Sequence, residues 1–537
     1  MMRFTIPISA DLRAMLSPDG RQVAYLFNGT VFIRSLDSST DRRLDAGLFA
    51  GDVEWSPDGG SVVVAGQGKL VRVNLPNGQT QILCDLPPAS PTLWTLGLAW
   101  SDAGTVLFSA GERIYQVPAT GGSPSPVTTF DRSRGDVAHL WPQFLPDGQH
   151  FIFVAQARNP ADSGVYVASL NSPETNLVVH TDRMARFTTG RLLFLRGDAL
   201  FAQRFDPETI RLYGSPVQLA NQIGSFVAYA YAQFSVSNTG VLLYSPAFYL
   251  GSQRELRWFD RGGKLLGTVG DPAPGVIVNL SPDETRVATA RYTDGRAGIW
   301  STDLKRNIAS PLDSQRAGEF DPQWAPDGSV IAFSSDRDGP MALFQKPLAG
   351  GSVERLRSSE ASIFMSDWSK DGRYILYHQT QSKLLAMPMP PEGKPIVVLD
   401  TPFLKDQAKF SPDTHWIAYN ANNSGRFEVY VTSFPQAKLE IPVSKDGGVQ
   451  PRWRRDGREL FFLDPQSRLM SVDVRPLKDG LEFGPPRVLF QAPIDASPEV
   501  ELYDVTGDGQ RFIMMAPIES STSRMNVIVN WPSALER

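Results

Sequence analysis

The sequence predicts an all-β protein made of two β-propellers, each with about six four-stranded blades. Three observations support this fold class. A turn motif, Ser-Pro-Asp-Gly or a degenerate form of it, occurs twelve times in 537 residues. From Asp283 the spacings between successive motif aspartates are 44, 44, 42 and 43 residues. The 45 glycines and 42 prolines gather in turns, as an all-β chain requires. A period of about 40–45 residues with four short strands is typical of propeller blades.

One repeat is clearest at residues 320–348. Its segments are a short apolar run, a turn, a strand, a second turn and a third strand, at 321–325, 326–328, 330–334, 336–340 and 342–346. The strands are rich in β-branched and aromatic residues, and the turns contain Pro, Asp and Gly. The other repeats follow this pattern.

A large apolar residue stands just before most of the motifs. These residues are Trp55, Trp100, Phe144, Phe187, Phe234, Leu280, Trp324, Trp368, Phe410 and Trp453. Both faces of a blade pack against neighbouring blades, so we expect these side chains at the contacts between blades. The motif aspartate suits the capping of turn amides, and the glycine suits positive φ. Calcium binding or catalysis is the alternative for the aspartates, but no further ligands are spaced around them.

Twelve blades exceed the roughly four to eight that one ring holds, so two rings are expected. A Gly/Pro-rich break at 270–275 is the expected boundary. Residues 10–270 then form the first propeller and 275–537 the second. The last repeat lacks an outer strand, and residues 1–9 contain a strand without a repeat of its own. We expect 3–8 to pair beside 526–531 and close the last blade of the second ring; the alternative is an outer strand on the first blade.

Composition restricts the partners. The net charge is -5, so nucleic acid is not expected. Cys84 is the only cysteine, which excludes an intrachain disulfide and fits a reducing compartment without excluding the periplasm. No signal peptide and no run of about 18 apolar residues is found, so membrane insertion is not expected. These features predict a cytoplasmic protein, or a periplasmic one if the chain is a fragment of a membrane-anchored sensor.

Several segments resemble the TolB-like, WD-like propeller repeats of bacterial proteins. They are 139–148, 258–264, 451–457 and 503–512, together with 529–531. The resemblance covers essentially the whole chain. The chain is most similar to the propeller region that follows a serine/threonine kinase domain in some soil bacteria. The kinase motifs, a Gly-rich phosphate loop, His-Arg-Asp and Asp-Phe-Gly, are missing, so kinase activity is not implied. The resemblance implies either a stand-alone homologue or the sensor half of a longer signalling protein.

Catalytic and metal sites have little support in the sequence. TolB-like propellers also cap prolyl-oligopeptidase-type peptidases, but no Gly-x-Ser-x-Gly elbow is present. A carbohydrate-active propeller has no specific sign. None of the five histidines is paired at a ligand spacing, so neither a metal nor a cofactor is expected. His139, which precedes Trp141 and Gln143, is either a hydrogen-bonding residue at a strand start or a ligand contact at the mouth of the first channel.

The position before the packing residue of the innermost strand is often polar. Its members are Glu54, Gln143, Arg186, Gln233, Asn279, Gln323, Asp367, Lys409 and Arg452. Innermost strands line the central channel, so these side chains could form a polar ring there or, alternatively, hydrogen bonds between blades. A binding site is predicted at the mouth of the second channel, where basic side chains would lie opposite an acidic and a polar one. The basic residues are Lys409, Arg452 and Arg454, and the other two are Asp367 and Gln323.

The sequence therefore favours a non-catalytic propeller, a scaffold or sensor that binds a protein segment or a small ligand. The predicted ligand-binding residues are His139, Trp141, Gln143, Gln323, Asp367, Lys409, Arg452 and Arg454. A hydrolase or lyase, peptidase-associated or carbohydrate-active, is the main alternative, and a structural spacer in a signalling protein is a third. An enzyme would need two titratable groups with shifted pKa values in one pocket.

Overall fold

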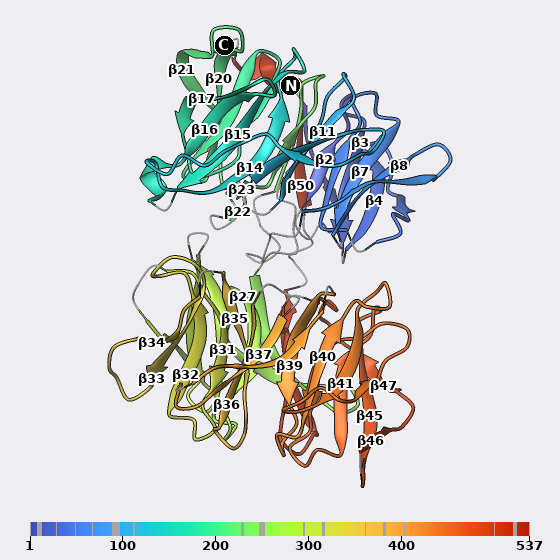
Figure 1. The fold of residues 1–537 in the computed structure, drawn as a ribbon, viewed down its shortest axis with the longest axis vertical. Coiled ribbons are helices and arrows are strands. Elements are labelled where there is room, and N and C mark those ends of the chain that lie inside the picture. Colours follow the sequence, from blue (N-terminus) through green and yellow to red (C-terminus); the bar gives the residue numbers. More distant parts are fainter. Residues whose placement is uncertain are drawn as a thin grey trace. The chain divides into compact units, whose positions relative to one another are not determined.

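The structure is a computed structural model in which β-strands form nearly all the regular structure (Figure 1). It describes residues 2–7, 13–27, 29–48, 50–66, 68–87, 97–110, 113–157, 159–226, 230–245, 253–293, 296–313, 317–359, 361–379, 383–391, 393–401, 403–478, 480–498, 500–518 and 524–535. Two short 3-10 turns are added, η1 (Pro160–Asp162) and η5 (Trp531–Leu535). Two compact units are present: Met1–Tyr249 with Thr522–Arg537, and Leu250–Ser521. No helix among the described residues has the length and apolar character needed to cross a membrane.

The first unit contains five consecutive four-stranded antiparallel sheets. They are β2 (Ala14–Leu16), β3 (Gln22–Phe27), β4 (Thr30–Ser35) and β5 (Asp41–Leu44); β6 (Asp52–Trp55), β7 (Ser61–Gly66), β8 (Lys69–Asn74) and β9 (Thr80–Asp85); β10 (Leu98–Trp100), β11 (Thr105–Ala110), β12 (Arg113–Pro118) and β13 (Ser125–Pro126); β14 (Asp136–Phe144), β15 (His150–Ala157), β16 (Gly164–Ser169) and β17 (Ser172–His180); β18 (Arg186–Thr188), β19 (Arg191–Arg196), β20 (Ala199–Asp206) and β21 (Arg211–Ala220).

A sixth sheet of the first unit draws its strands from three parts of the chain. It runs β24 (Phe234–Val236), β25 (Val241–Tyr244), β50 (Arg524–Val529) and β1 (Met2–Pro7). A two-stranded ribbon, β22 (Ser225–Phe226) and β23 (Tyr231–Ala232), precedes it. The first strands β2, β6 and β10 contact one another in turn, as do β10 and β14, and β24 contacts both β18 and β2. The sheets therefore form a ring.

The second unit has the same construction. Its sheets are the end of β27 (Leu265–Leu280) with β28 (Arg286–Thr293), β29 (Arg296–Asp303) and β30 (Ile308–Pro311); β31 (Glu319–Trp324), β32 (Val330–Ser335), β33 (Ala342–Pro347) and β34 (Glu354–Arg357); β35 (Ile363–Trp368), β36 (Tyr374–Gln379), β37 (Lys383–Pro388) and β38 (Ile396–Asp400); β39 (Lys405–Phe410), β40 (Trp416–Ala421), β41 (Glu428–Ser433) and β42 (Glu440–Pro442); β43 (Val449–Trp453), β44 (Glu459–Leu463), β45 (Arg468–Leu477), β46 (Gly480–Phe483) and β47 (Arg487–Gln491). The last sheet runs β48 (Tyr503–Val505), β49 (Arg511–Pro517), β26 (Gln253–Asp260) and the start of β27.

The all-β fold class with four-stranded antiparallel sheets is confirmed, and the packing residues lie where expected. Trp55, 3% exposed, packs with side chains of the first two sheets. Its indole Nε1 donates a hydrogen bond of 3.0 Å to the Met15 carbonyl of the preceding sheet. Trp324 and Trp453 donate in the same way to Asn279 and Lys409, over 3.0 and 3.2 Å. These indoles both fill the space between blades and tie the blades together.

The motif aspartates cap their turns. Asp283 accepts hydrogen bonds from Ser281 Oγ at 2.6 Å and from the Thr285 amide at 3.1 Å. Asp371 accepts equivalent bonds from Ser369 Oγ and the Arg373 amide, at 2.7 and 3.0 Å. The recurrence of these bonds accounts for the Ser-x-Asp pattern as local turn chemistry.

The predicted pairing of the chain ends occurs, but in the first unit. β1 and β50 are antiparallel partners from Met2 opposite Val529 to Pro7 opposite Arg524. Their sheet contains β24 and β25, not the strands at Tyr503 and Phe512. The expectation that they close the second ring is therefore wrong. The physical reason is that β26 pairs along the outer edge of β49 and completes the last sheet of the second unit.

The expected boundary at 270–275 falls inside β27, which continues without interruption from one sheet to the next. The two units divide between Tyr249 and Leu250 instead. The second unit is thus an insertion between β25 and β50 of the first unit's sixth sheet. Pro272 and Pro274 do not break β27 because they lie where its pairing changes partner. The pairing with β26 ends at Pro274, opposite Gln253, and the pairing with β28 begins at Gly275.

Candidate functional site

A β-bulge interrupts each of the first five inner strands of the second unit. The register shifts lie between Val276 and Val278, Phe320 and Gln323, Met365 and Asp367, Asp406 and Lys409, and Val449 and Arg452. Four residues in these bulges have positive φ, of 62°, 54°, 53° and 57°: Ile277, Asp321, Gln407 and Gln450. A bulge redirects side chains locally.

A small cavity lies where the bulges meet. Its volume is about 10 Å³, room for about one water molecule. It is lined by Ile277, Asp321, Gln323, Met365, Ser366, Asp406, Gln407 and Glu501. These residues come from β27, β31, β35, β39 and the segment before β48. Side chains far apart in the sequence therefore converge here.

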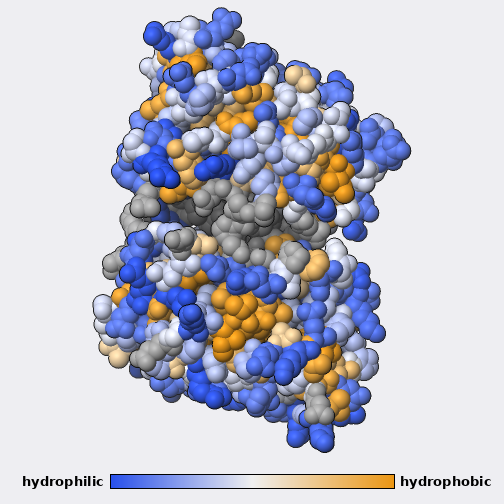
Figure 2. Space-filling model, in the orientation of Figure 1, coloured by the Kyte–Doolittle hydropathy of each residue, from blue (hydrophilic) through white to orange (hydrophobic). Residues whose placement is uncertain are grey.

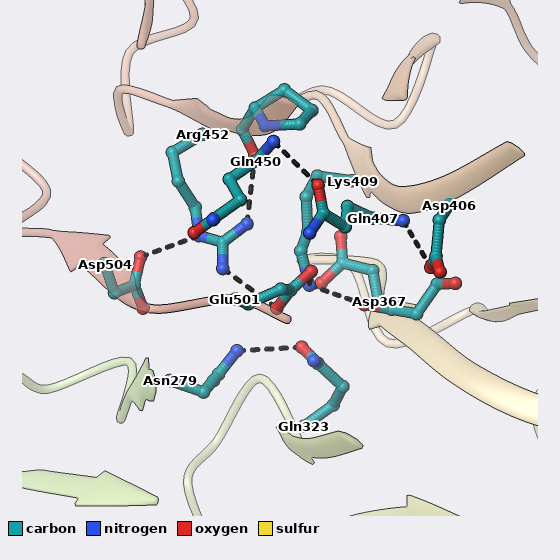
Figure 3. Close-up of polar contacts among 12 residues, drawn as sticks. Asn279, Gln323, Asp367, Asp406, Gln407, Lys409, Gln450, Arg452, Glu501 and Asp504 are labelled. Carbon is teal, nitrogen blue, oxygen red and sulfur yellow. Dashed lines mark hydrogen bonds and ion pairs between the residues drawn. The ribbon is translucent and has the colours of Figure 1, made fainter. Parts of the chain in front are cut away.

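The predicted polar ring largely joins one blade to the next (Figure 3). Asn279 Nδ2 donates to Gln323 Oε1 at 2.9 Å. The Asp367 carboxylate accepts from the Phe410 amide at 2.8 Å, and Asp504 accepts from the Leu280 amide at 2.7 Å. The last bond links the final blade to the first. Hydrogen bonding between blades, the alternative considered from the sequence, describes these side chains.

Lys409 and Arg452 meet at one carboxylate (Figure 3). Lys409 Nζ lies 3.0 Å from Glu501 Oε1, and Arg452 Nη2 lies 2.8 Å from Glu501 Oε2. Burial raises the pKa of Glu501, but Arg452 and Lys409 outweigh it, so the pKa is below its ordinary value. Lys409 also donates to the Ser366 carbonyl at 2.6 Å. The two cations predicted to face a ligand are thus paired within the chain.

Glu501 belongs to a connection between β47 and β48, described at 492–498 and 500–502, to which three side chains of the inner strands and their neighbours form hydrogen bonds. Gln407 Nε2 donates to the Val500 carbonyl at 2.9 Å. Gln450 Oε1 accepts from the Leu502 amide at 2.8 Å, and Asn420 Nδ2 donates to the Pro498 carbonyl at 3.3 Å. Sequence reasoning missed this segment because it lies outside the strand pattern.

The cavity wall is acidic. Burial and the neighbouring carboxylates Asp406 and Glu501 raise the pKa of Asp321 to about 8. The only hydrogen bond that Asp321 accepts among the described residues comes from Ser334 Oγ, at 3.1 Å. His378 Nδ1 lies 3.8 Å from Asp406, but burial lowers the pKa of His378 to about 4. His378 is therefore neutral at pH 7 and does not offset the carboxylates.

The other predicted site residues lie elsewhere. Arg454 bonds to Asp456 at 2.7 Å and to Glu459 at 3.1 Å, in the turn after β43, and is not drawn into this cluster. His139 is fully buried between the rings of Phe130 and Phe153, with Nε2 3.0 Å from Asp136.

Trp141 and Gln143 lie at the first unit's inner strand β14. The Trp141 ring centroid is 4.0 Å from the Arg13 guanidinium and 4.9 Å from the Tyr231 ring. The Gln143 amide bonds to the Phe187 amide and carbonyl, at 2.7 and 2.8 Å. Trp141 and Gln143 therefore belong to the first unit, apart from the predicted residues of the second unit.

The bulges had a signal in the sequence. Pro142, Pro322 and Pro451 each follow a bulge residue inside a strand-like run, and a proline within an inner strand indicates a bulge. No group of three or more His, Cys, Asp or Glu side chains in the described ranges is placed to hold a metal ion.

Four-stranded sheets around a centre lined by their first strands define a β-propeller protein. Within this class, residues 272–453 match the family described as the TolB beta propeller domain. No curated protein sequence matches the chain.

Solved structures with similarity include TolB proteins and a protease. A protein described as TolB from Agrobacterium tumefaciens is 18% identical, with a TM-score of 0.39 over 50% of this chain and 99% of that one. TolB from Acinetobacter baumannii is 14% identical, with a TM-score of 0.35 over 61% and 78%. The tricorn protease is 12% identical, with a TM-score of 0.28 over 88% and 48%. The fold assignment rests on the strand pairing described above.

Proposed function

We propose that this chain is a non-catalytic scaffold or sensor that binds a protein segment or a small ligand at the centre of the second unit. The part of the ligand that enters the cavity is positively charged, and a primary ammonium fits the cavity best. A TolB-like propeller fold suits a binding or scaffold role. The observation that carries the proposal is the acidic cavity formed by Asp321, Asp406 and Glu501.

The charge balance supports a cationic ligand. Of the three wall carboxylates, Glu501 is the one that Lys409 and Arg452 neutralise. Asp321 forms no ion pair with the described residues, and its raised pKa reflects repulsion as well as burial. With a pKa of about 8, Asp321 is mostly protonated at pH 7, and a cation placed between Asp321 and Asp406 would displace this proton and stabilise both carboxylates. A cavity of about 10 Å³ accepts a group the size of an ammonium, not a whole ligand.

An acid–base enzyme is a second candidate, because the cavity also holds two carboxyl groups whose pKa values are pushed apart. The pKa of Asp321 is raised to about 8, and that of Glu501 is lowered. Such a pair can supply a general acid and a general base. Against this function, Glu501 is held by two cations, and the cavity leaves no room for a substrate's reacting centre.

Calorimetric titration with a blocked tripeptide, acetyl-Gly-Lys-Gly-amide, tests the proposal. We expect binding by the unmodified chain and at least tenfold weaker binding by the double variant Asp321→Asn, Asp406→Asn, because charge pairing to the ammonium is lost. The acetylated-lysine version of the peptide, which has no ammonium, should not bind.

Asp327→Asn is the matched control, since this carboxylate caps an exposed turn through Ser329. It should bind as the unmodified chain does. Equal affinity of the double variant and the unmodified chain, or equal affinity for both peptides, would discard the site. Peptide cleavage that Asp321→Asn abolishes would favour the enzyme.

A further inference from the structure

A second charged centre lies inside the first unit, separate from the site proposed above. Glu54 lies on β6 and Arg186 on β18. The first strands of the six sheets contact one another in ring order, and two hydrogen bonds between Gln143 and Phe187, one donated by each residue, join β14 to β18. β6 and β18 are three sheets apart in this ring, so Glu54 and Arg186 face each other across its centre.

Among the described residues, no carboxylate lies within ion-pair distance of the buried cation Arg186. Arg186 is 6% exposed, and its hydrogen bond in the described part of the chain runs from Nη1 to the neighbouring Ala185 carbonyl, 3.4 Å away. Glu54 is near enough to attract it, yet forms no ion pair with it; Glu54 Oε1 instead accepts from the Trp55 amide at 2.8 Å.

Four other buried arginines each have a carboxylate partner. Arg13 pairs with Asp52, Arg34 with Asp41, Arg183 with Asp182 and Arg452 with Glu501. Asp52 has other partners, because its Oδ1 pairs with Arg13 and its Oδ2 accepts from the Gly97 amide at 2.9 Å. An unpaired buried charge costs several kcal/mol by general estimates, so proteins rarely keep one without a partner.

We propose that the centre of the first unit binds a monovalent carboxylate, held by the Arg186 guanidinium on one side and by a protonated Glu54 on the other. A guanidinium presents paired N–H donors that match a carboxylate. The neutral Glu54 carboxyl donates a hydrogen bond to the same ligand. No bond is made or broken in this binding.

The local charge favours a monovalent ligand. Among the four described charged groups that interact here, Arg13 and Asp52 cancel, so Arg186 carries the net positive charge when Glu54 is neutral. Burial raises the pKa of Glu54 to about 7, although Arg186 and Arg13 oppose the rise and Asp52 adds to it. A dianion would be repelled by the Asp52 carboxylate and by Glu54 once Glu54 ionises. Binding should therefore weaken above pH 7, as Glu54 loses its proton.

Thermal denaturation of the full chain at pH 6.5 tests the site, with sodium acetate against sodium chloride at equal ionic strength. We expect acetate to raise the Tm of the unmodified chain, and Arg186→Met to remove this rise. Without acetate, the Tm of Arg186→Met should equal or exceed that of the unmodified chain, because the variant removes an uncompensated charge. Arg34→Met is the control; it should lower the Tm through the loss of the Asp41 pair, yet keep the acetate effect.

A second measurement, calorimetric titration at pH 6.5 and 8.5, keeps the test sharp. We expect at least tenfold weaker acetate binding by Arg186→Met and a loss of the pH dependence in Glu54→Gln. A tripeptide with a free C-terminus, beside its amidated form, tells whether a chain end supplies the carboxylate. No acetate binding, an equal acetate effect in Arg186→Met, or tighter binding of divalent phosphate would overturn the proposal.

Discussion

Asp321 illustrates how a single backbone conformation produces an unusual side chain. Its φ of 54° places it in the left-handed region, where residues with a Cβ are uncommon. The bulge directs its carboxylate toward Asp406 and Glu501, and burial together with the charges of these two neighbours raises its pKa to about 8. Such a conformation is retained only where the surrounding structure over-determines it, and such residues gather at functional sites.

The raised pKa of Asp321 predicts a specific pH dependence of stability. The folded state holds the proton more tightly than the unfolded state, so this contribution is complete below about pH 4 and is lost as pH rises through 8. Asp321→Asn should therefore stabilise the second unit at pH 9, by roughly 1–3 kcal/mol, and change its stability little at pH 4.

Urea denaturation followed at pH 4 and pH 9 measures this difference. Asp327→Asn is the control with the opposite sign, since hydrogen bonds from Ser329 lower the pKa of Asp327. The stability that Asp327 contributes is lost as pH falls. Destabilisation by Asp321→Asn at pH 9 would contradict the prediction.

The sequence identified some residues at the centre of the second unit and missed others. Gln323, Asp367, Lys409 and Arg452 were found by position, because each precedes the packing residue of an inner strand. Asp321, Gln407 and Glu501 were missed. The first two lie in bulges, which break the alternation used to assign faces, and Glu501 lies on an irregular segment.

At the scale of the element, the turn motif tolerates a residue other than glycine at a cost. Gly328 and Gly372 have positive φ at the last position of the motif, and Thr414 takes the same conformation with φ 61°. A β-branched residue is strained there, by about 1–2 kcal/mol. Thr414 Oγ1 is also buried without a hydrogen-bond partner.

Thr414→Gly should therefore stabilise the second unit by about 1 kcal/mol, since the strain and the unpaired hydroxyl both disappear. Thermal unfolding of the variant measures the gain as an increase in Tm. The reciprocal change Gly372→Thr places the same residue in an equivalent turn, where a Cβ meets little besides Pro326, and should lower the Tm. A fall in Tm for Thr414→Gly would show that the threonine is needed.

The elements themselves were predictable because their signal is local. Proline, aspartate and glycine define each turn, and apolar strand formers flank it, so the sheet pattern follows from the sequence alone. The assignment of outer strands was not predictable in this way. β1, β26 and β50 each pair with residues far away in the chain, and any exposed strand edge accepts a partner by the same hydrogen bonds.

At the scale of the whole molecule, the insertion means that only the second unit is built from one continuous stretch of chain. Leu250–Ser521 contains every strand of its own sheets. The first unit depends on β50, which follows the insertion and pairs with both β25 and β1.

Deletion of residues 522–537 should thus destabilise the first unit selectively. It removes the buried residues Met525, Val527 and Trp531 and exposes the edge of β25. In calorimetry of the shortened chain, the second unit should unfold at its former temperature. The unfolding transition of the first unit should occur at a lower temperature or be absent. Limited proteolysis should cut within residues 1–249 and spare 250–521. Equal loss of both transitions would mean that the units do not fold independently.

The divided sixth sheet also sets an order for biosynthesis. A chain emerging from the ribosome exposes the first five sheets early, but β50 is made after all of the inserted residues. The second unit can therefore fold before the sixth sheet of the first unit is complete. Until β50 is translated, β25 offers an unpaired strand edge to chaperones or to neighbouring nascent chains, so the first unit remains incomplete for as long as the inserted residues are being made.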